Sequence, residues 1–223
     1  MKNLKPLLKL DFQLLKPYWI WWVLFLGIAL VVGLLNQMGF VFMVSLAMFA
    51  ATIMAFPFES TDKSNLHVLF STLPTNRRSM VLARYIFILI GLAVALVVGI
   101  VLAIVIDLIF TPQVSTLDPM YFLTSVSLFL ALFTLVVGFQ TPFFYRFGYV
   151  KGKIFMWVPI VLIMIAMMLP GLLSIFNIES SFNIFSAMFL NPLPTSLIAL
   201  AFAIGGMILS FFLSKMIYLK KDI

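Results

Sequence analysis

The chain has 223 residues, of which 64% are hydrophobic and only 9% are charged, and its formal net charge is +7. Water-soluble globular domains have about 25% charged residues, so this composition excludes that class of protein. The absence of cysteine excludes disulfides, thiolate metal sites and cysteine nucleophiles.

Apolar runs long enough to cross a lipid bilayer recur along the chain. A helix needs ~20 apolar residues to span a hydrocarbon core of ~30 Å, and the strand alternation of an outer-membrane barrel is absent. The sequence therefore predicts an all-α polytopic membrane protein with a single domain over residues 1–223. We expect six transmembrane helices, approximately over residues 18–35, 40–56, 79–110, 121–141, 154–176 and 195–213.

Residues 1–17, which precede the first span, have the pattern of an amphipathic helix. The four lysines between positions 2 and 16 share one helical stripe, and leucines occupy another. Such a helix suits the interface of an anionic inner leaflet, and Pro17 separates it from the first span. An ordinary polar N-terminal tail is the alternative interpretation.

The segment 58–78, between the second and third predicted spans, is the longest polar interruption of the chain. Four of its apolar residues stand at i, i+3, i+4 and i+7, which is the pattern of an amphipathic helix. They are Leu66, Leu69, Phe70 and Leu73. We expect a short helix over residues 60–73 that lies at the membrane face.

Polar residues accompany this apolar stripe. Glu59 precedes the expected helix, and Asp62 would lie in its first turn, where a negative charge favours the helix dipole. His67 is the only histidine of the chain. We interpret it as a surface residue of the helix, with a ligand or pH-sensing role as the alternative.

Three arginines, Arg77, Arg78 and Arg84, stand at the start of the third span. A cation is slightly unfavourable at a helix N-terminus, so helix stability does not explain them. We interpret them as anchors to lipid headgroups or as contacts to an acidic protein partner.

The third span also carries a row of small residues at four-residue spacing, which allows another helix to approach closely. The row consists of Gly91, Ala95, Gly99 and Ala103. Asp107 follows near the outer end of the same span. An ionisable residue in a membrane helix suggests a functional site such as a proton relay, but we favour an interfacial carboxylate in contact with water.

The positive charges are distributed asymmetrically. With six spans and both termini inside, all 14 Lys and Arg residues fall on the cytoplasmic side. This is the positive-inside pattern of a multi-pass protein of a cytoplasmic membrane. The positive charge therefore forms a collar at the membrane. It does not form a groove interleaved with aromatic residues that could hold a nucleic-acid strand, which excludes nucleic acid as a partner.

No catalytic or metal-binding motif is recognisable. A single histidine cannot supply the paired ligands of a zinc protease helix, and the glycine-containing stretch 148–153 lacks the phosphate-loop pattern. We therefore expect no enzymatic activity and no cofactor bound by the chain itself.

The stretch from Phe58 to Tyr85 resembles the permease subunit of ABC-2 type (type V) ABC transporters of the compact bacterial group. The similarity is an acidic residue, a short helix, Leu-Pro, a basic pair, and an Arg before an aromatic residue. The matching positions are Glu59, Leu73, Pro74, Arg77, Arg78, Arg84 and Tyr85. The basic N-terminal helix and the segments 142–153 and 213–223 are also similar, so the resemblance covers the whole chain.

This resemblance implies that residues 1–17 form an elbow helix and that the segment 58–78 carries a cytoplasmic coupling helix, over residues 60–73. The coupling helix would sit in a groove of a separate ATPase subunit, which binds ATP and Mg²⁺. The expected coupling residues are Glu59, Asp62, Leu66, His67, Leu69, Phe70, Leu73, Arg77 and Arg78.

The resemblance also implies a second permease chain, identical or related, and surrounding membrane lipids. It predicts export of amphipathic peptides, such as phenol-soluble-modulin-like peptides, or of other membrane-active compounds from a bacterial cell. Two alternatives remain open. One is a proton-coupled secondary transporter that needs Asp107, and the other is a membrane immunity protein without an ATPase.

Overall fold

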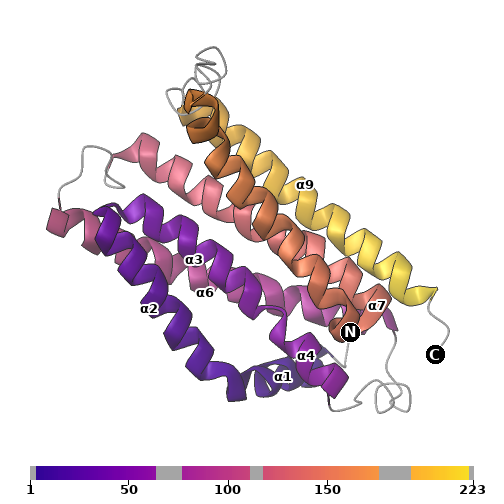
Figure 1. The fold of residues 1–223 in the computed structure, drawn as a ribbon. Helices are drawn as coiled ribbons and strands as arrows, with labels where there is room; N and C mark the ends of the chain where they lie inside the picture. The colour runs from indigo at the N-terminus through magenta and orange to yellow at the C-terminus, as the bar shows by residue number, and fades with distance from the viewer. Residues whose placement is uncertain (1–3, 64–76, 111–117, 176–191, 221–223) are drawn as a thin grey trace.

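The computed structural model describes residues 4–63, 77–110, 118–175 and 192–220, and every element within these ranges is a helix (Figure 1). The elements are α1 (Leu4–Leu15), the short 3-10 helix η1 (Lys16–Tyr18), α2 (Trp19–Asn36), α3 (Gly39–Ile53), α4 (Phe56–Lys63), α6 (Arg77–Phe110), α7 (Pro119–Ile175) and α9 (Pro192–Leu219). The prediction of an all-α polytopic membrane protein is confirmed, because five described helices are long and apolar enough to cross a membrane.

The longest helix, α7, reverses direction at Gly148. This glycine has φ 75° and ψ 172°, a conformation that favours a residue without Cβ. The first arm (119–147) and the second arm (149–175) then run antiparallel (Figure 1), and the ring of Phe143 stacks on that of Phe155 at 4.5 Å. The count of six crossings stays a prediction, with α7 contributing two of them.

The fourth span was predicted over residues 121–141, with Pro142 as the residue that ends its helix, and this helix end was wrong. The helix continues through Pro142 and leaves helical geometry only at Gly148, so the segment 142–153, which we expected to be an inner loop, is a tight helical reversal. Membrane helices tolerate an internal proline because neighbouring helices and hydroxyl side chains can satisfy the freed backbone groups.

A similar shift occurs at the end of the second predicted span. The helix α3 ends at Ile53, and α4 begins at Phe56 with Pro57 in its first turn. Proline is favoured there, because the N–H that it lacks would have no partner within the helix. Proline therefore starts a helix here, where we expected it to end one.

The helix α3 lies at the centre of the bundle, between α2, α6 and α7 (Figure 1). Its Phe42, Met43 and Ala47 are almost completely buried. The row of small residues on α6 faces α3: a Cβ at Gly91 would lie 2.7 Å from Met54 Sδ, and one at Gly99 would lie 3.2 Å from Leu46 Cδ2. The row therefore allows a close approach to a helix of the same chain.

Asp107 fixes the start of α3 against α6. Its Oδ1 accepts a hydrogen bond of 2.7 Å from the Gly39 N–H, and only 1% of the residue is exposed. The interpretation of Asp107 as an interfacial carboxylate in contact with water was therefore wrong. A negative charge at a helix N-terminus favours the helix dipole and satisfies an N–H that has no partner in the helix.

We predict that Gly39→Ala destabilises the protein, because the new Cβ would overlap the Ala103 carbonyl oxygen and lie 2.9 Å from Asp107 Oδ1. Overpacking of this kind costs about 1–3 kcal/mol. The measurement is the thermal denaturation midpoint in a mild detergent. Gly27→Ala is the matched control, since a Cβ at Gly27 has no neighbour within 4 Å. Equal midpoints for the two variants would contradict the prediction.

Candidate functional site

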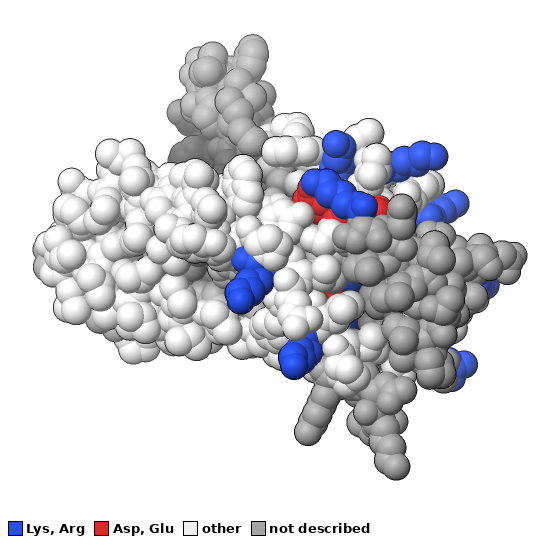
Figure 2. All heavy atoms as spheres, turned by 90° about the horizontal axis from the view of Figure 1, so that it is seen from below, with Lys and Arg blue, Asp and Glu red and all other residues white. Residues whose placement is uncertain are grey.

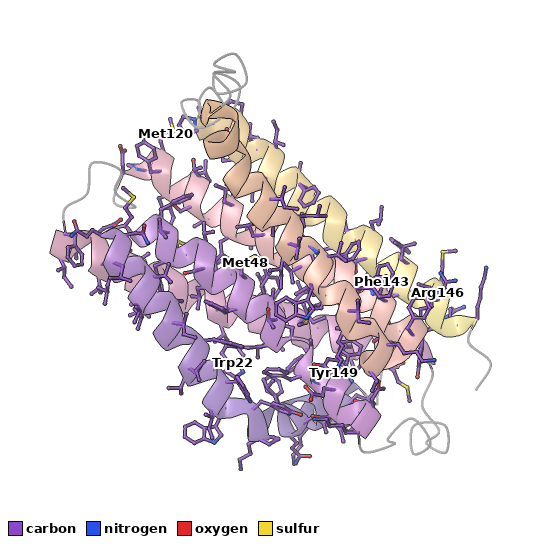
Figure 3. The ribbon with its side chains drawn as sticks, viewed as in Figure 1. Trp22, Met48, Met120, Phe143, Arg146 and Tyr149 are labelled. Atoms are coloured by element: carbon purple, nitrogen blue, oxygen red, sulfur yellow. The ribbon has the colours of Figure 1, made fainter. Side chains whose placement is uncertain are left out.

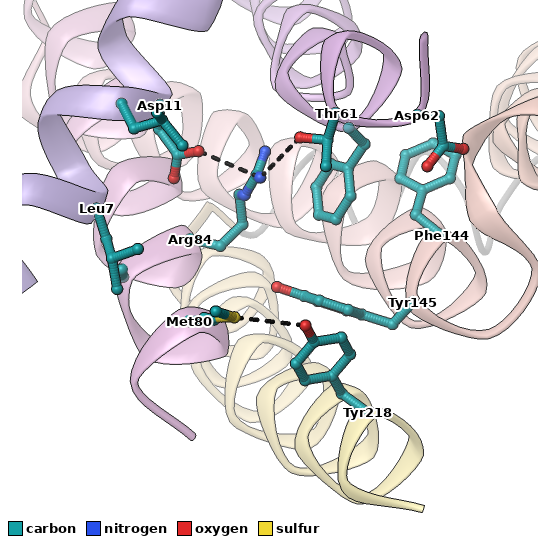
Figure 4. A pocket seen from close by; sticks show the side chains of 12 residues that line it. Leu7, Asp11, Thr61, Asp62, Met80, Arg84, Phe144, Tyr145 and Tyr218 are labelled. Atoms are coloured by element: carbon teal, nitrogen blue, oxygen red, sulfur yellow. Dashed lines mark hydrogen bonds and ion pairs between the residues drawn. The ribbon is translucent and has the colours of Figure 1, made fainter. Parts of the chain in front are cut away.

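At one end of the bundle, α1, α4, α6, α7 and α9 converge on the side chain of Arg84 (Figure 4). A small pocket lies beside the guanidinium, and each of the five helices contributes to its lining. The lining residues are Leu7, Leu10, Asp11, Phe58, Thr61, Asp62, Met80, Ala83, Arg84, Phe144, Tyr145 and Tyr218. We call this set of residues the Arg84 junction.

Arg84 links three helices directly. Its Nη2 lies 3.2 Å from Oδ1 of Asp11 on α1 and donates a hydrogen bond of 3.4 Å to Thr61 Oγ1 on α4. Its guanidinium carbon also lies 4.4 Å from the centroid of the Phe58 ring. Arg84 is 8% exposed and Asp11 is 4% exposed, so this is a buried ion pair.

The interpretation of Arg84 as a headgroup anchor or a contact to an acidic partner was wrong, because its carboxylate partner is Asp11 of the same chain. Arg78 is exposed, as a headgroup anchor would be. The missed signal was in α1: Asp11 follows Leu7 by four residues, so the two share the face that the helix buries.

A second carboxylate ties α4 to α7. Asp62 accepts a hydrogen bond from the Tyr149 N–H, directly after the reversal at Gly148. Asp62 was expected in the first turn of its own helix, but it lies in the last turn of α4. It instead supplies a negative charge to the N-terminus of the second arm of α7, where a cap satisfies an orphan N–H.

Hydroxyl groups complete the connection to α9. The Tyr85 hydroxyl lies 2.6 Å from Ser210 Oγ and 2.9 Å from Ser214 Oγ, and the Tyr218 hydroxyl donates to Met80 Sδ at 3.4 Å. Sequence reasoning missed this contact. Two serines four residues apart on an otherwise apolar helix were the available signal, because such residues share one face.

The predicted coupling residues are only partly described. Glu59 lies in the first turn of α4 and pairs with Lys63 at 2.6 Å, and Arg77 is the first residue of α6. Five others lie outside the described residues, namely Leu66, His67, Leu69, Phe70 and Leu73. Their contacts to an ATPase therefore stay a prediction. Among the described residues, no group of His, Asp and Glu could hold a metal ion.

Basic residues gather toward the end of the molecule that contains the Arg84 junction. On the face shown in Figure 2, the Lys and Arg side chains lie in the middle and on the right, and the left part of the surface carries none among the described residues. This distribution agrees with a positive collar at one membrane interface.

We predict that Arg84→Met lowers the free energy of unfolding by about 3–5 kcal/mol, because it leaves the Asp11 carboxylate buried without its cation. The double variant Arg84→Met with Asp11→Leu should recover part of this loss, with a coupling free energy of about 0.5–3 kcal/mol. Reversible unfolding in mixed micelles measures both quantities.

Lys63→Met is the control for removal of a cation at the same end. Lys63 is exposed, and such ion pairs contribute little to stability, so the unfolding midpoint should stay nearly unchanged. If the Arg84 and Asp11 substitutions had additive effects on the free energy of unfolding, the two residues would not act as a pair, and the prediction would be contradicted.

The comparisons with known proteins identify the family. A family model described as ABC-2 family transporter protein matches residues 6–219, from α1 to the end of α9. No curated protein and no solved structure gave a match. The match confirms the resemblance that the sequence around Glu59 to Tyr85 indicates. The chain therefore belongs to the ABC-2 family of transporter proteins and is a multi-pass membrane permease.

Proposed function

We propose that this chain is the permease subunit of an ATP-driven exporter in a bacterial cytoplasmic membrane, with both termini inside. A separate ABC ATPase subunit binds ATP and Mg²⁺, and a second permease chain, identical or related, completes the transport pathway. The exported compounds are amphipathic peptides, phenol-soluble-modulin-like peptides among them, or other membrane-active molecules. The family match over residues 6–219 carries this proposal.

The Arg84 junction gives the proposal a physical route for coupling. The helix α4 begins the segment that would meet the ATPase, and side chains connect it to three helices. Ser60 Oγ donates to the Leu14 carbonyl oxygen on α1 at 3.4 Å, Thr61 accepts from Arg84 on α6, and Asp62 accepts from the Tyr149 N–H on α7. A displacement of α4 must therefore move these helices or break buried polar contacts.

Breaking these contacts is the less favourable outcome. A displacement of α4 alone would break the hydrogen bonds of Thr61 with Arg84 and of Asp62 with the Tyr149 N–H, and hydrogen bonds to charged groups contribute about 1.5–3 kcal/mol each. The rings of Phe58 and Phe144, tilted by 44° with centroids 5.2 Å apart, add apolar contact between α4 and α7. The junction therefore moves as a unit, and a push from the ATPase passes into α6 and into the second arm of α7.

The first test is capture of the tagged chain from its native membrane in a mild detergent, followed by mass spectrometry. We expect a stoichiometric ABC ATPase subunit. Leu69→Glu and Phe70→Glu should each abolish this association, because a charge on the apolar stripe cannot enter an apolar groove, while the melting midpoint of the membrane domain stays unchanged.

Recovery of the intact, dimeric chain without any ATPase would argue for one of the two alternatives, a proton-coupled secondary transporter or a membrane immunity protein. Normal association and export in both glutamate variants would defeat the assignment of residues 60–73 as the coupling helix. Lys63→Gln is the matched control, because it changes an exposed position of α4 beside the segment. Leu82→Glu is not suitable as a control, because it would place a charge within a spanning helix.

A second prediction separates this function from proton-coupled transport. Asp107→Asn removes the ionisable group, but its amide oxygen can still accept the Gly39 N–H. We expect export in inverted vesicles to continue, to depend on ATP, and to persist when a protonophore collapses the proton gradient. Loss of transport in this variant, together with loss on collapse of the gradient, would identify a proton-coupled transporter.

A further inference from the structure

We propose that the groove between the first arm of α7 and α9 binds one anionic phospholipid from the leaflet at the basic end of the molecule. The groove is lined almost entirely by apolar side chains and opens at the surface of the bundle. Its principal residues are Phe139 and Phe143 on α7, and Phe202, Gly205, Leu209 and Leu213 on α9. The proposal does not depend on the identity of the exported compound.

Glycines create the groove. A Cβ at Gly206 would lie 3.1 Å from Thr134 Cγ2, and one at Gly138 would lie 3.7 Å from the Gly206 carbonyl oxygen, so the two helices approach closely through these residues. A Cβ at Gly205 would instead meet no atom within 4 Å. The missing side chain at Gly205 therefore leaves space between the walls, while the side chain of Leu209 is 61% exposed.

The length of the groove matches one lipid leaflet. At 1.5 Å per residue, the α9 wall from Phe202 to Leu213 extends about 16 Å. Half of a hydrocarbon core of ~30 Å is about 15 Å. An acyl chain in the groove would therefore be in contact with apolar side chains along its whole length.

Each wall continues into a cation at the same end. Arg146, which is labelled in Figure 3, follows Pro142 by one helical turn on the first arm of α7. Lys220 follows Leu213 by two turns at the end of α9, and both cations are exposed. Their neighbours Tyr145 and Tyr218 both belong to the Arg84 junction, so the two cations lie at one level.

This arrangement favours a lipid headgroup over a second copy of the chain. Two copies related by an axis along the membrane normal keep their residues at equal depth, so this face would bring the Arg146 and Lys220 cations of both copies together. Like charges at close range repel. A phosphate headgroup neutralises them, and basic pockets between membrane helices on the cytoplasmic side bind anionic headgroups.

The test is native mass spectrometry of the purified full-length chain in detergent, titrated with dioleoylphosphatidylglycerol or dioleoylphosphatidylcholine. Because each cation near a membrane surface contributes about fivefold to anionic lipid binding, we expect about 25-fold tighter binding of phosphatidylglycerol. The double variant Arg146→Gln with Lys220→Gln should bind the two lipids equally. Gly205→Leu, which fills the groove, should weaken binding of both.

Two controls match these variants. Lys63→Gln with Lys151→Gln removes two exposed cations from α4 and from the second arm of α7, neither of which lines the groove, and Gly27→Leu fills an open glycine position on α2. Neither should change the preference for phosphatidylglycerol. Equal binding of the two lipids by the unaltered chain would overturn the proposal, and so would equal losses in the test and control variants. Dissociation of a permease dimer by Gly205→Leu without any effect on lipid binding would assign the face to a second copy.

Discussion

The buried pair of Arg84 and Asp11 determines how the remaining elements at the basic end are arranged. A guanidinium inside a protein is tolerated when a carboxylate and other acceptors surround it. Asp11 can reach Arg84 only if α1 lies against α6, and Thr61 and Phe58 can reach it only if α4 approaches the same part of α6. One long-range electrostatic requirement thus places α1 and α4 together at this end of α6.

Two aspartates at opposite ends of the bundle each accept an N–H group at the N-terminus of a helix. Helix N-termini carry N–H groups without a partner and a partial positive charge, and neither can be satisfied by lipid. Asp107 accepts the N–H of Gly39 at the start of α3, and Asp62 accepts that of Tyr149 at the start of the second arm of α7. In each case the carboxylate comes from a different helix, so the contact also fixes one helix relative to another.

The features that the sequence predicted correctly are those that depend on local patterns. Long apolar runs identify membrane helices by length alone, and the spacing of Gly91 to Ala103 defines one helical face regardless of what packs on it. The burial of Arg84 was not predictable in this way. A cation near a membrane interface has the same local sequence whether it faces headgroups or a carboxylate, and Asp11 lies far away in the chain.

Pro142 and Pro57 show a second limit of local reasoning. Both were expected to end helices, as proline does within a soluble helix. Pro57 stands at a helix start, where its missing N–H has no consequence, and Pro142 lies inside a membrane helix that continues to the reversal. The position of Gly148, with its positive φ, determines where the chain turns, and the sequence contains several other glycines that could have served.

The locations of the buried charges indicate at which end of the protein a conformational change can be driven. Arg84 and Asp107 lie on the same helix, and at 1.5 Å per residue they are about 35 Å apart along α6. Protonation of Asp107 would remove the charge that favours the N-terminus of α3 and would weaken the contact that holds α3 on α6. A proton relay at that position would therefore disturb the central helix of the fold.

At the other end, α4 is joined to α1, α6 and α7 by side chains that can move together. The geometry thus favours a mechanical input at the basic end, which is the kind of input that an ATPase subunit supplies.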